Sequence, residues 1–129
     1  MLDTNTISHL LRAHPEVGRR VTATAMASLC MSAITQGELL FGLAKRPEAT
    51  RLHRAVRELL RRLDALPWDS AAADRYGTVR AAMTRHGKTL APLDLLIAAH
   101  ALSVGAVLVT NDRAFGLVAE LPIEDWSVE

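Results

Sequence analysis

Four acidic residues lie at element boundaries or among apolar neighbours, where a carboxylate is able to do chemistry. Asp3 follows the apolar start "ML", and Asp112 follows the apolar run "AVLVT", so both lie at the carboxyl ends of expected strands. Glu38 stands in "GELLF" and Asp94 in "PLDLL", each near the start of an expected helix. In parallel α/β sheets, ligands bind beyond the carboxyl ends of the strands. We therefore expect the four side chains to converge at one edge of a sheet.

Such convergence has an electrostatic cost that predicts a bound cation. Two carboxylates ~4 Å apart repel each other by roughly 4 kcal/mol at an effective dielectric constant of about 20. A cluster of them must therefore protonate in part or bind a cation. Hard oxygen ligands without nearby His or Cys favour Mg²⁺ or Mn²⁺ over Zn²⁺. Because Mg²⁺ shares its coordination shell with water and substrate phosphate, the pattern favours phosphodiester chemistry.

Each acid also has a purely structural interpretation, and the residues alone leave both interpretations open. Asp3 fits a helix N-cap, and Asp94 fits a first-turn acid favoured by the helix dipole. Glu38 fits a solvent-facing helix position, and Asp112 fits a turn residue in "TND". The combination favours a common site, because four unrelated structural acids would not all be expected at the same edge.

Hydrophobic patterning predicts strands that alternate with helices at least three times. Buried strands are expected at 29–34, 65–68 and 106–110, with a terminal edge segment at 122–126. Helices are expected at 4–12, from Pro15, from a Thr35 cap to before Pro47, over 48–63, from Asp69 or Ser70 to Arg85, and from Pro92 to Gly105. The alternation predicts an α/β fold of three layers with a mainly parallel central sheet.

Composition predicts one cytoplasmic domain over residues 1–129. A chain of this length with 50% hydrophobic residues buries one sizeable core. The single Cys30 cannot form an internal disulfide and fits a reducing compartment. The start of the chain lacks the pattern of a secretory signal, and the apolar stretch 93–109 is interrupted by polar residues and a glycine, which argues against a membrane span.

Four stretches together resemble a known family: "LDTN", "SAITQGELLFGLAKRP", "PLDLLIAAHALSVGAVLVTNDRAF" and "EDW". They are similar to the PIN-domain ribonucleases and, within them, to the VapC toxins of bacterial toxin–antitoxin pairs. The resemblance implies a PIN-like three-layer α/β/α fold and Mg²⁺- or Mn²⁺-dependent endoribonuclease activity that leaves a 5′ phosphate. It also implies homodimerisation and neutralisation by a VapB-type antitoxin. The late motifs are most similar to the branch that cuts initiator tRNA, which makes the tRNA anticodon stem-loop a candidate substrate.

The resemblance further implies which residues form the site. The catalytic, metal-binding acids would be Asp3, Glu38, Asp94 and Asp112, with Thr4, Asn5 and Thr110 as polar neighbours. Asp94 or Glu38 would orient or deprotonate the attacking water. The chain departs from many relatives at Gly37, which loosens the helix around Glu38 by up to ~1 kcal/mol relative to Ala. The position of the fourth acid, here Asp112, varies within the family.

Basic residues are concentrated in segment 45–62, which predicts an RNA-binding face or a solvated helix surface. The segment holds seven Lys or Arg and two Glu, so the remainder of the chain is net acidic although the whole carries +1. Candidate phosphate contacts are Lys45, Arg46, and the pair Arg85 and Lys88 in "TRHGK". His100 lies six residues beyond Asp94, off its helical face, and is expected to pack or lie at an interface rather than catalyse.

Two other functions compete with the nuclease hypothesis. A catalytically silent interaction domain would use the same acids only as caps and surface charge. A phosphatase would use Asp3 as a nucleophile, but that chemistry usually needs a second Asp two residues on, where Asn5 stands. The phosphatase is therefore the weaker alternative.

Overall fold

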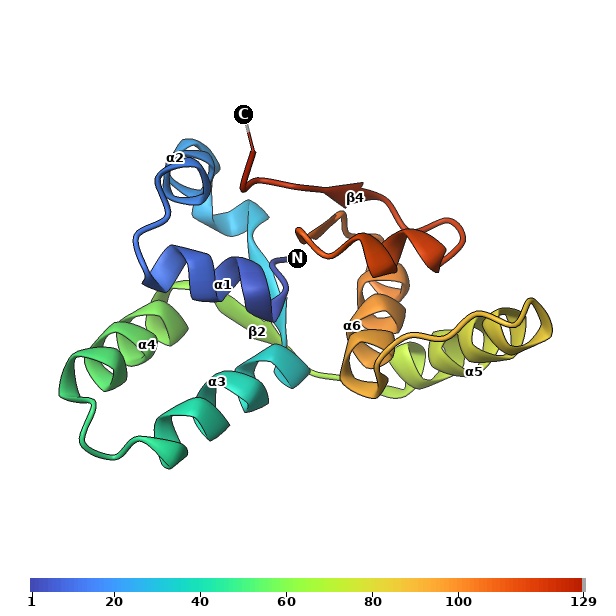
Figure 1. Ribbon diagram of the computed structural model, residues 1–129, viewed down its shortest axis with the longest axis horizontal. Helices are drawn as coiled ribbons and strands as arrows, with labels where there is room; N and C mark the ends of the chain where they lie inside the picture. Colours follow the sequence, from blue (N-terminus) through green and yellow to red (C-terminus); the bar gives the residue numbers. More distant parts are fainter. Residues whose placement is uncertain (129) are drawn as a thin grey trace.

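The computed structural model describes residues 1–128, with helices on both sides of a short sheet that Figure 1 shows nearly edge-on. The helices are α1 (Thr4–Leu11), α2 (Pro15–Ala23), α3 (Ala33–Lys45), α4 (Thr50–Arg62), α5 (Ser70–Arg85) and α6 (Pro92–Ser103). The strands are β1 (Cys30–Ser32), β2 (Asp64–Leu66), β3 (Leu108–Val109) and β4 (Ile123–Glu124). Two 3₁₀ turns complete the described elements: η1 (Met26–Ser28) and η2 (Arg113–Leu117).

Residues 1–3 join two pairs of parallel strands into one layer. Strand β1 pairs with β2, and β3 pairs with β4, both in parallel. The backbone N–H of Leu2 donates to the carbonyl of Cys30 at 2.8 Å, and Leu2 also forms a parallel bridge with Val109. The resulting order is β2, β1, residues 1–3, β3, β4. The start of the chain therefore lies at the centre of the sheet.

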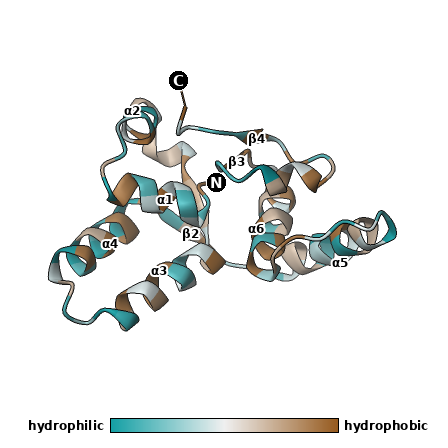
Figure 2. Ribbon diagram, in the orientation of Figure 1, coloured by the Kyte–Doolittle hydropathy of each residue, from teal (hydrophilic) through white to brown (hydrophobic). Residues whose placement is uncertain are grey.

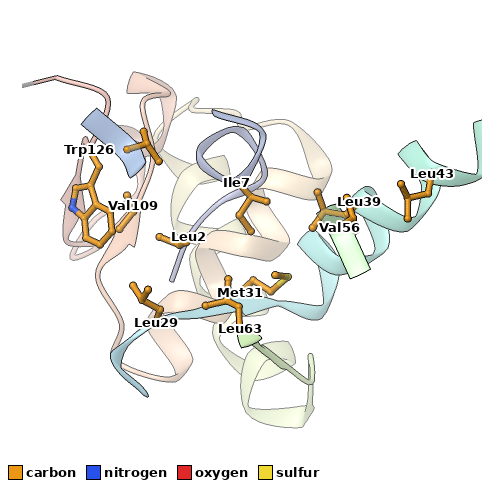
Figure 3. Packing of buried hydrophobic residues seen from close by; sticks show 11 residues of the cluster. Leu2, Ile7, Leu29, Met31, Leu39, Leu43, Val56, Leu63, Val109 and Trp126 are labelled. Atoms are coloured by element: carbon orange, nitrogen blue, oxygen red, sulfur yellow. The ribbon is translucent and has the colours of Figure 1, made fainter. Parts of the chain in front are cut away.

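Side chains that alternate along the strands enter two different cores. Leu2, Met31 and Val109 pack into the core under α1 to α4, as Figure 3 shows, whereas Met1 and Leu108 pack into the core under α5 and α6. This period of two is what a strand buried on both faces requires. The two cores, one on each face of the sheet, confirm the predicted three-layer α/β fold.

Helix α4 has the amphipathic character that its sequence predicts. Val56 is 1% exposed and packs under the sheet, while Arg51, Arg54 and Arg57 are exposed. Figure 2 shows the same division, with brown and teal segments alternating along α4. Helix α4 is thus held by one apolar stripe and presents its cations outward.

The predicted boundaries around β1 and α3 are wrong by a few residues. Thr35 does not cap α3, because Ser32 does: its Oγ accepts from the N–H of Ile34 at 3.1 Å, and the helix begins at Ala33. A Ser hydroxyl at this position satisfies a helix N–H that would otherwise have no partner. The strand expected to reach residue 34 therefore stops at Ser32, and β3 is likewise shorter than predicted.

The other helix ends confirm the predicted signals. Asp69 caps α5 by accepting from the N–H of Ala72 at 3.1 Å. Helix α6 begins at Pro92, and Gly105, with φ +65°, follows its C-terminal end. The apolar stretch 93–109 is thus divided between α6 and β3. Over residues 1–128, none of the helices combines the length and the apolar character needed to cross a bilayer.

Truncating the Met31 side chain tests whether β1 is buried in the core as the structure shows. Met31 is fully buried in β1, whereas Met26 in η1 is 44% exposed. We expect Met31→Ala to lower the free energy of unfolding by about 2–5 kcal/mol, because it leaves a cavity. Met26→Ala should change it by less than about 1 kcal/mol. Urea denaturation of both variants measures the difference, and equal losses would contradict this packing.

Candidate active site

Asp3 is fixed at the point where the sheet meets α1. Its Oδ1 accepts from the N–H of Thr6 at 2.8 Å, which makes it the N-cap of α1, and its own N–H donates to the carbonyl of Val109 at 3.1 Å. The side chain is buried, with 3% exposure. The cap uses one carboxylate oxygen, so the capping interpretation is confirmed and leaves Oδ2 for a further ligand.

Glu38 is held by α1 rather than left in solvent. The hydroxyl of Thr4 donates to Glu38 Oε1 at 2.6 Å, and Thr4 Oγ1 also lies 3.3 Å from Thr35 Oγ1. A hydrogen bond to a carboxylate is shorter and stronger than one between neutral groups. The N-terminal parts of α1 and α3 are therefore tied together at the acid, even though Gly37 precedes it.

Asp112 and Thr110 form a tight turn after β3. Asp112 Oδ1 accepts from the N–H of Ala114 at 2.9 Å, and its own N–H donates to Thr110 Oγ1 at 3.0 Å. Thr110 is 2% exposed and Asp112 is half-buried. The turn interpretation of Asp112 is therefore confirmed, and the turn holds its carboxylate at the carboxyl end of β3.

The pKa of Asp94 is affected by the other three carboxylates. It lies in the first turn of α6, where burial raises its pKa above the ordinary value of 3.8. The negative charges of Asp112, Glu38 and Asp3 raise the pKa further, in that order. Acids from both ends of the chain and from its middle thus lie within electrostatic reach of Asp94.

The four acids do not form a closed ligand cage. Within residues 1–128, no three Asp, Glu, His or Cys side chains come close enough together to hold an ion as they stand. The donor set nevertheless fits a hard divalent cation, because it offers only oxygen atoms. A bound cation would also offset the negative charges that raise the pKa of Asp94. Mg²⁺ commonly uses one or two protein carboxylates and retains several waters.

The basic side chains predicted to contact phosphate lie in two separate groups. Lys45 Nζ is 4.8 Å from the centroid of the Phe41 ring, and Arg46 lies 3.9 Å from Glu48 with both side chains exposed. This pair is at the turn from α3 to α4, whereas Arg85 and Lys88 lie at the end of α5 and in the following loop. Figure 1 places the two groups at opposite ends of the molecule.

Of these four basic side chains, Lys88 lines the two cavities of residues 1–128 that lie next to α5. A cavity of about 250 Å³ is lined by Lys88 together with Pro92 and Leu95, which flank Asp94 along α6. A larger one, of about 360 Å³, lies between α5 and η2 and is also lined by Lys88. None of the four acids lines either cavity, but the smaller one reaches the first turn of α6, which carries Asp94. Asn5 is exposed in the first turn of α1, next to Thr4.

Two polar residues near the site escape prediction from sequence. Thr35 was expected only as a cap, yet it is fully buried beside Thr4. Its spacing of three residues from Glu38 places both on one face of α3, a signal that could have identified it. Ser32 contacts His100, which is 1% exposed, so the prediction of His100 as a packing residue is confirmed.

Comparison with known proteins identifies the family. The family model described as "PIN domain" matches residues 1–121. The chain belongs to the PIN-domain family. Its relatives include the proteins named "tRNA(fMet)-specific endonuclease VapC" from Shigella flexneri, 36% identical over 128 residues, and from Salmonella typhimurium, 38% identical over 127 residues. The alignments cover 98% of this chain and 97% and 96% of those PIN-domain proteins.

A solved PIN-domain structure agrees with this fold. The chain superposes on the DNA-bound VapBC of Salmonella typhimurium with a TM-score of 0.91 at 38% identity, covering 98% of this chain and 96% of that one. The resemblance seen in the sequence motifs is therefore confirmed at the level of family and fold.

Replacing Asp94 tests the electrostatic cluster. A carboxyl whose pKa is raised by folding binds its proton more tightly in the folded state, so its contribution to stability is lost as pH rises from about 3.8 through the raised pKa. In metal-free protein at pH 7, Asp94→Asn should therefore raise Tm, and the difference should shrink as pH falls towards 4.

Asp74→Asn is the matched control, because Asp74 is exposed on α5 and does not contribute to the Asp94 shift. Thermal denaturation in EDTA across this pH range makes the measurement. A lower Tm for Asp94→Asn would mean that Asp94 mainly stabilises the start of α6.

Proposed function

We propose that this chain is an endoribonuclease toxin of the VapC type that hydrolyses RNA phosphodiester bonds at the acidic site. The observation that carries the proposal is the raised pKa of Asp94, which reports carboxylates from three other elements. It is supported by two relatives named as tRNA(fMet)-specific endonucleases, which make tRNA the candidate substrate class. Within tRNA, the anticodon stem-loop is the candidate site that the sequence resemblance implies.

A divalent cation fits the same site. Asp3, Glu38, Asp94 and Asp112 would hold Mg²⁺ or Mn²⁺, directly or through water. Such an ion lowers the pKa of a bound water and neutralises charge on the attacked phosphate. Its binding would also relieve the repulsion that raises the pKa of Asp94.

The protein residues have different roles in the proposed reaction. Asp94 is the preferred proton acceptor for the attacking water, because the other three acids already accept hydrogen bonds from protein donors. The water oxygen bonds to phosphorus, the bond from phosphorus to the 3′ oxygen breaks, and solvent protonates that oxygen. The products are a 5′ phosphate and a 3′ hydroxyl. The Thr4 hydroxyl keeps Glu38 oriented, and the α1 cap keeps Asp3 oriented.

RNA would be held by cations beyond the acidic site. Lys88 is the best placed, since it lines the cavity beside Pro92 and Leu95. Arg85 would contact the same strand of RNA, while Lys45 and Arg46 would hold a more distant part. Phosphate contacts of this kind position RNA without reading its sequence.

The same proposal covers partners and location. A VapB-type antitoxin would neutralise the toxin, as suggested by the similarity to VapC in the VapBC complex of Salmonella typhimurium. Residues 1–129 would act as a single nuclease domain that forms a homodimer in the cytoplasm, where its RNA substrate is found.

Cleavage assays test the proposed activity. Purified protein with Mn²⁺ should cut tRNA, EDTA should abolish cutting, and Asp94→Asn should lower kcat by roughly 100-fold or more. Asp74→Asn should retain full activity. Cutting in EDTA or full activity of Asp94→Asn would refute the metal site, and failure to cut any RNA would favour the silent interaction domain.

Salt dependence tests the proposed RNA contact at Lys88. Lys88→Ala should raise KM for all RNAs alike and reduce the slope of log KM against log salt by about 1, as expected for one lost phosphate contact. Arg19→Ala is the control, because Arg19 is exposed on α2 and paired with Glu16 at 2.8 Å. An unchanged slope for Lys88→Ala would exclude this contact.

A further inference from the structure

A buried hydrogen bond connects α6 to the start of α3. His100 Nδ1 lies 2.7 Å from Ser32 Oγ, and the two residues are 1% and 0% exposed. They are 68 positions apart in the chain. Ser32 Oγ is also the N-cap of α3, since it accepts from the N–H of Ile34 at 3.1 Å. A single hydroxyl therefore serves both helices.

The hydrogens at this bond can be assigned by accounting for donors and acceptors. The Ile34 N–H uses a lone pair of Ser32 Oγ, so the hydroxyl hydrogen is free to be donated to His100 Nδ1. This requires a neutral imidazole with its hydrogen on Nε2.

The surroundings of the ring favour that neutral form. Burial lowers the pKa of His100 below its ordinary value of 6.5, and the charge of Asp69 and the hydrogen bond to Pro67 oppose the shift only in part. The ring is therefore neutral at pH 7. A buried, satisfied hydrogen bond of this kind fixes the relative position of the segments that it joins.

Those segments carry two acids of the site. Asp94 lies six residues before His100 on α6, and Glu38 lies six residues after Ser32 on α3. Six residues of α-helix span about 9 Å, so each acid lies at a similar distance along its helix from the hydrogen bond between His100 and Ser32. The position of α3 against α6 at this bond therefore sets where Glu38 stands relative to Asp94.

We propose that His100 and Ser32 are a positioning pair that holds Glu38 and Asp94 at the separation required to bind the divalent cation. The inference rests on the proposed function, because it assumes that these two acids share an ion. Breaking the bond between His100 and Ser32 frees the start of α3 and weakens cation binding and kcat together. It leaves KM for RNA nearly unchanged, because the candidate RNA contacts lie at the far end of α3, in the following turn, or near the end of α5 rather than at the start of α3.

Two substitutions of His100 separate the hydrogen bond from simple packing. His100→Phe keeps a ring but removes the acceptor for Ser32, and should weaken Mn²⁺ affinity and lower kcat, each by about 10- to 100-fold. His100→Asn places an amide oxygen near the former Nδ1, can accept from Ser32, and should recover most of both losses. Mn²⁺ binding is followed by electron paramagnetic resonance of the free ion, and kcat and KM by tRNA cleavage.

Trp68→Phe is the matched control. The Trp68 indole donates to the carbonyl of Leu96 at 2.9 Å, so it joins α6 to the loop before α5 without involving α3. It should leave Mn²⁺ affinity and kcat within about threefold of the unsubstituted protein. The inference is overturned if His100→Phe behaves like Trp68→Phe, or if His100→Asn recovers nothing.

Ser32→Ala provides a second test should His100→Phe fail to fold. It removes the same bond from the other side together with the α3 cap, and should weaken Mn²⁺ affinity by at least the same factor. His14→Ala removes the side-chain cap of α2, a helix without site residues, and should leave Mn²⁺ affinity unchanged. Equal effects of these two variants would overturn the inference. Absence of both Mn²⁺ binding and cleavage in the unsubstituted protein would instead refute the proposed function.

Discussion

Apolar burial on both faces of a parallel sheet is the constraint on which this structure depends, because it gathers carboxylates at one edge of the sheet. Hydrophobic burial on both faces of the sheet forces the chain to place residues 1–3 between β1 and β3. The same topology delivers Asp3 and Asp112 to the carboxyl ends of strands and Asp94 to the start of a helix. Apolar packing thereby gathers negative charges that destabilise the fold when no cation is bound. The cost is visible at Asp94, whose pKa is raised by burial and by its three acidic neighbours.

The protein limits that cost by giving most of the acids a second partner. Asp3 caps α1, Asp112 caps η2, and Glu38 accepts from the Thr4 hydroxyl. Each of these hydrogen bonds gives a carboxylate oxygen a protein donor. In the part of the chain that the structure describes, Asp94 accepts no such bond, and it is the acid with a raised pKa. Structural and chemical interpretations of an acid are therefore not exclusive: a cap occupies one carboxylate oxygen and leaves the other for a ligand.

How much the sequence predicts depends on whether a signal is local. The layers, the start of α6 at Pro92 and the turn at Gly105 follow from local patterning and were predicted correctly. The cap of α3 was misplaced, because Ser32 and Thr35 are both suitable N-cap residues and only the sheet register, which ends β1 at Ser32, decides between them. The contact between Ser32 and His100 could not be predicted, since it joins residues 68 positions apart through the packing of α6 against β1. The positions of the acids near element boundaries are predictable because those boundaries are set locally, whereas the separations between the acids depend on tertiary packing.

The repulsion that strains the free site would act equally on an RNA phosphate brought to it. Four carboxylates repel an approaching phosphate unless positive charge lies between them. The cation that would lower the repulsion at Asp94 would therefore also lower the repulsion between the site and the RNA phosphate. Lys45, Arg46 and Lys88 do not take this role, because Lys45 and Arg46 lie at the far turn of α3 and α4, and Lys88 lines a neighbouring cavity. Their position suits them to hold the flanking backbone instead. A net charge of only +1 thus conceals an acidic centre between two basic groups, an arrangement in which, under the proposed function, affinity for RNA and reactivity towards it would be set by different residues.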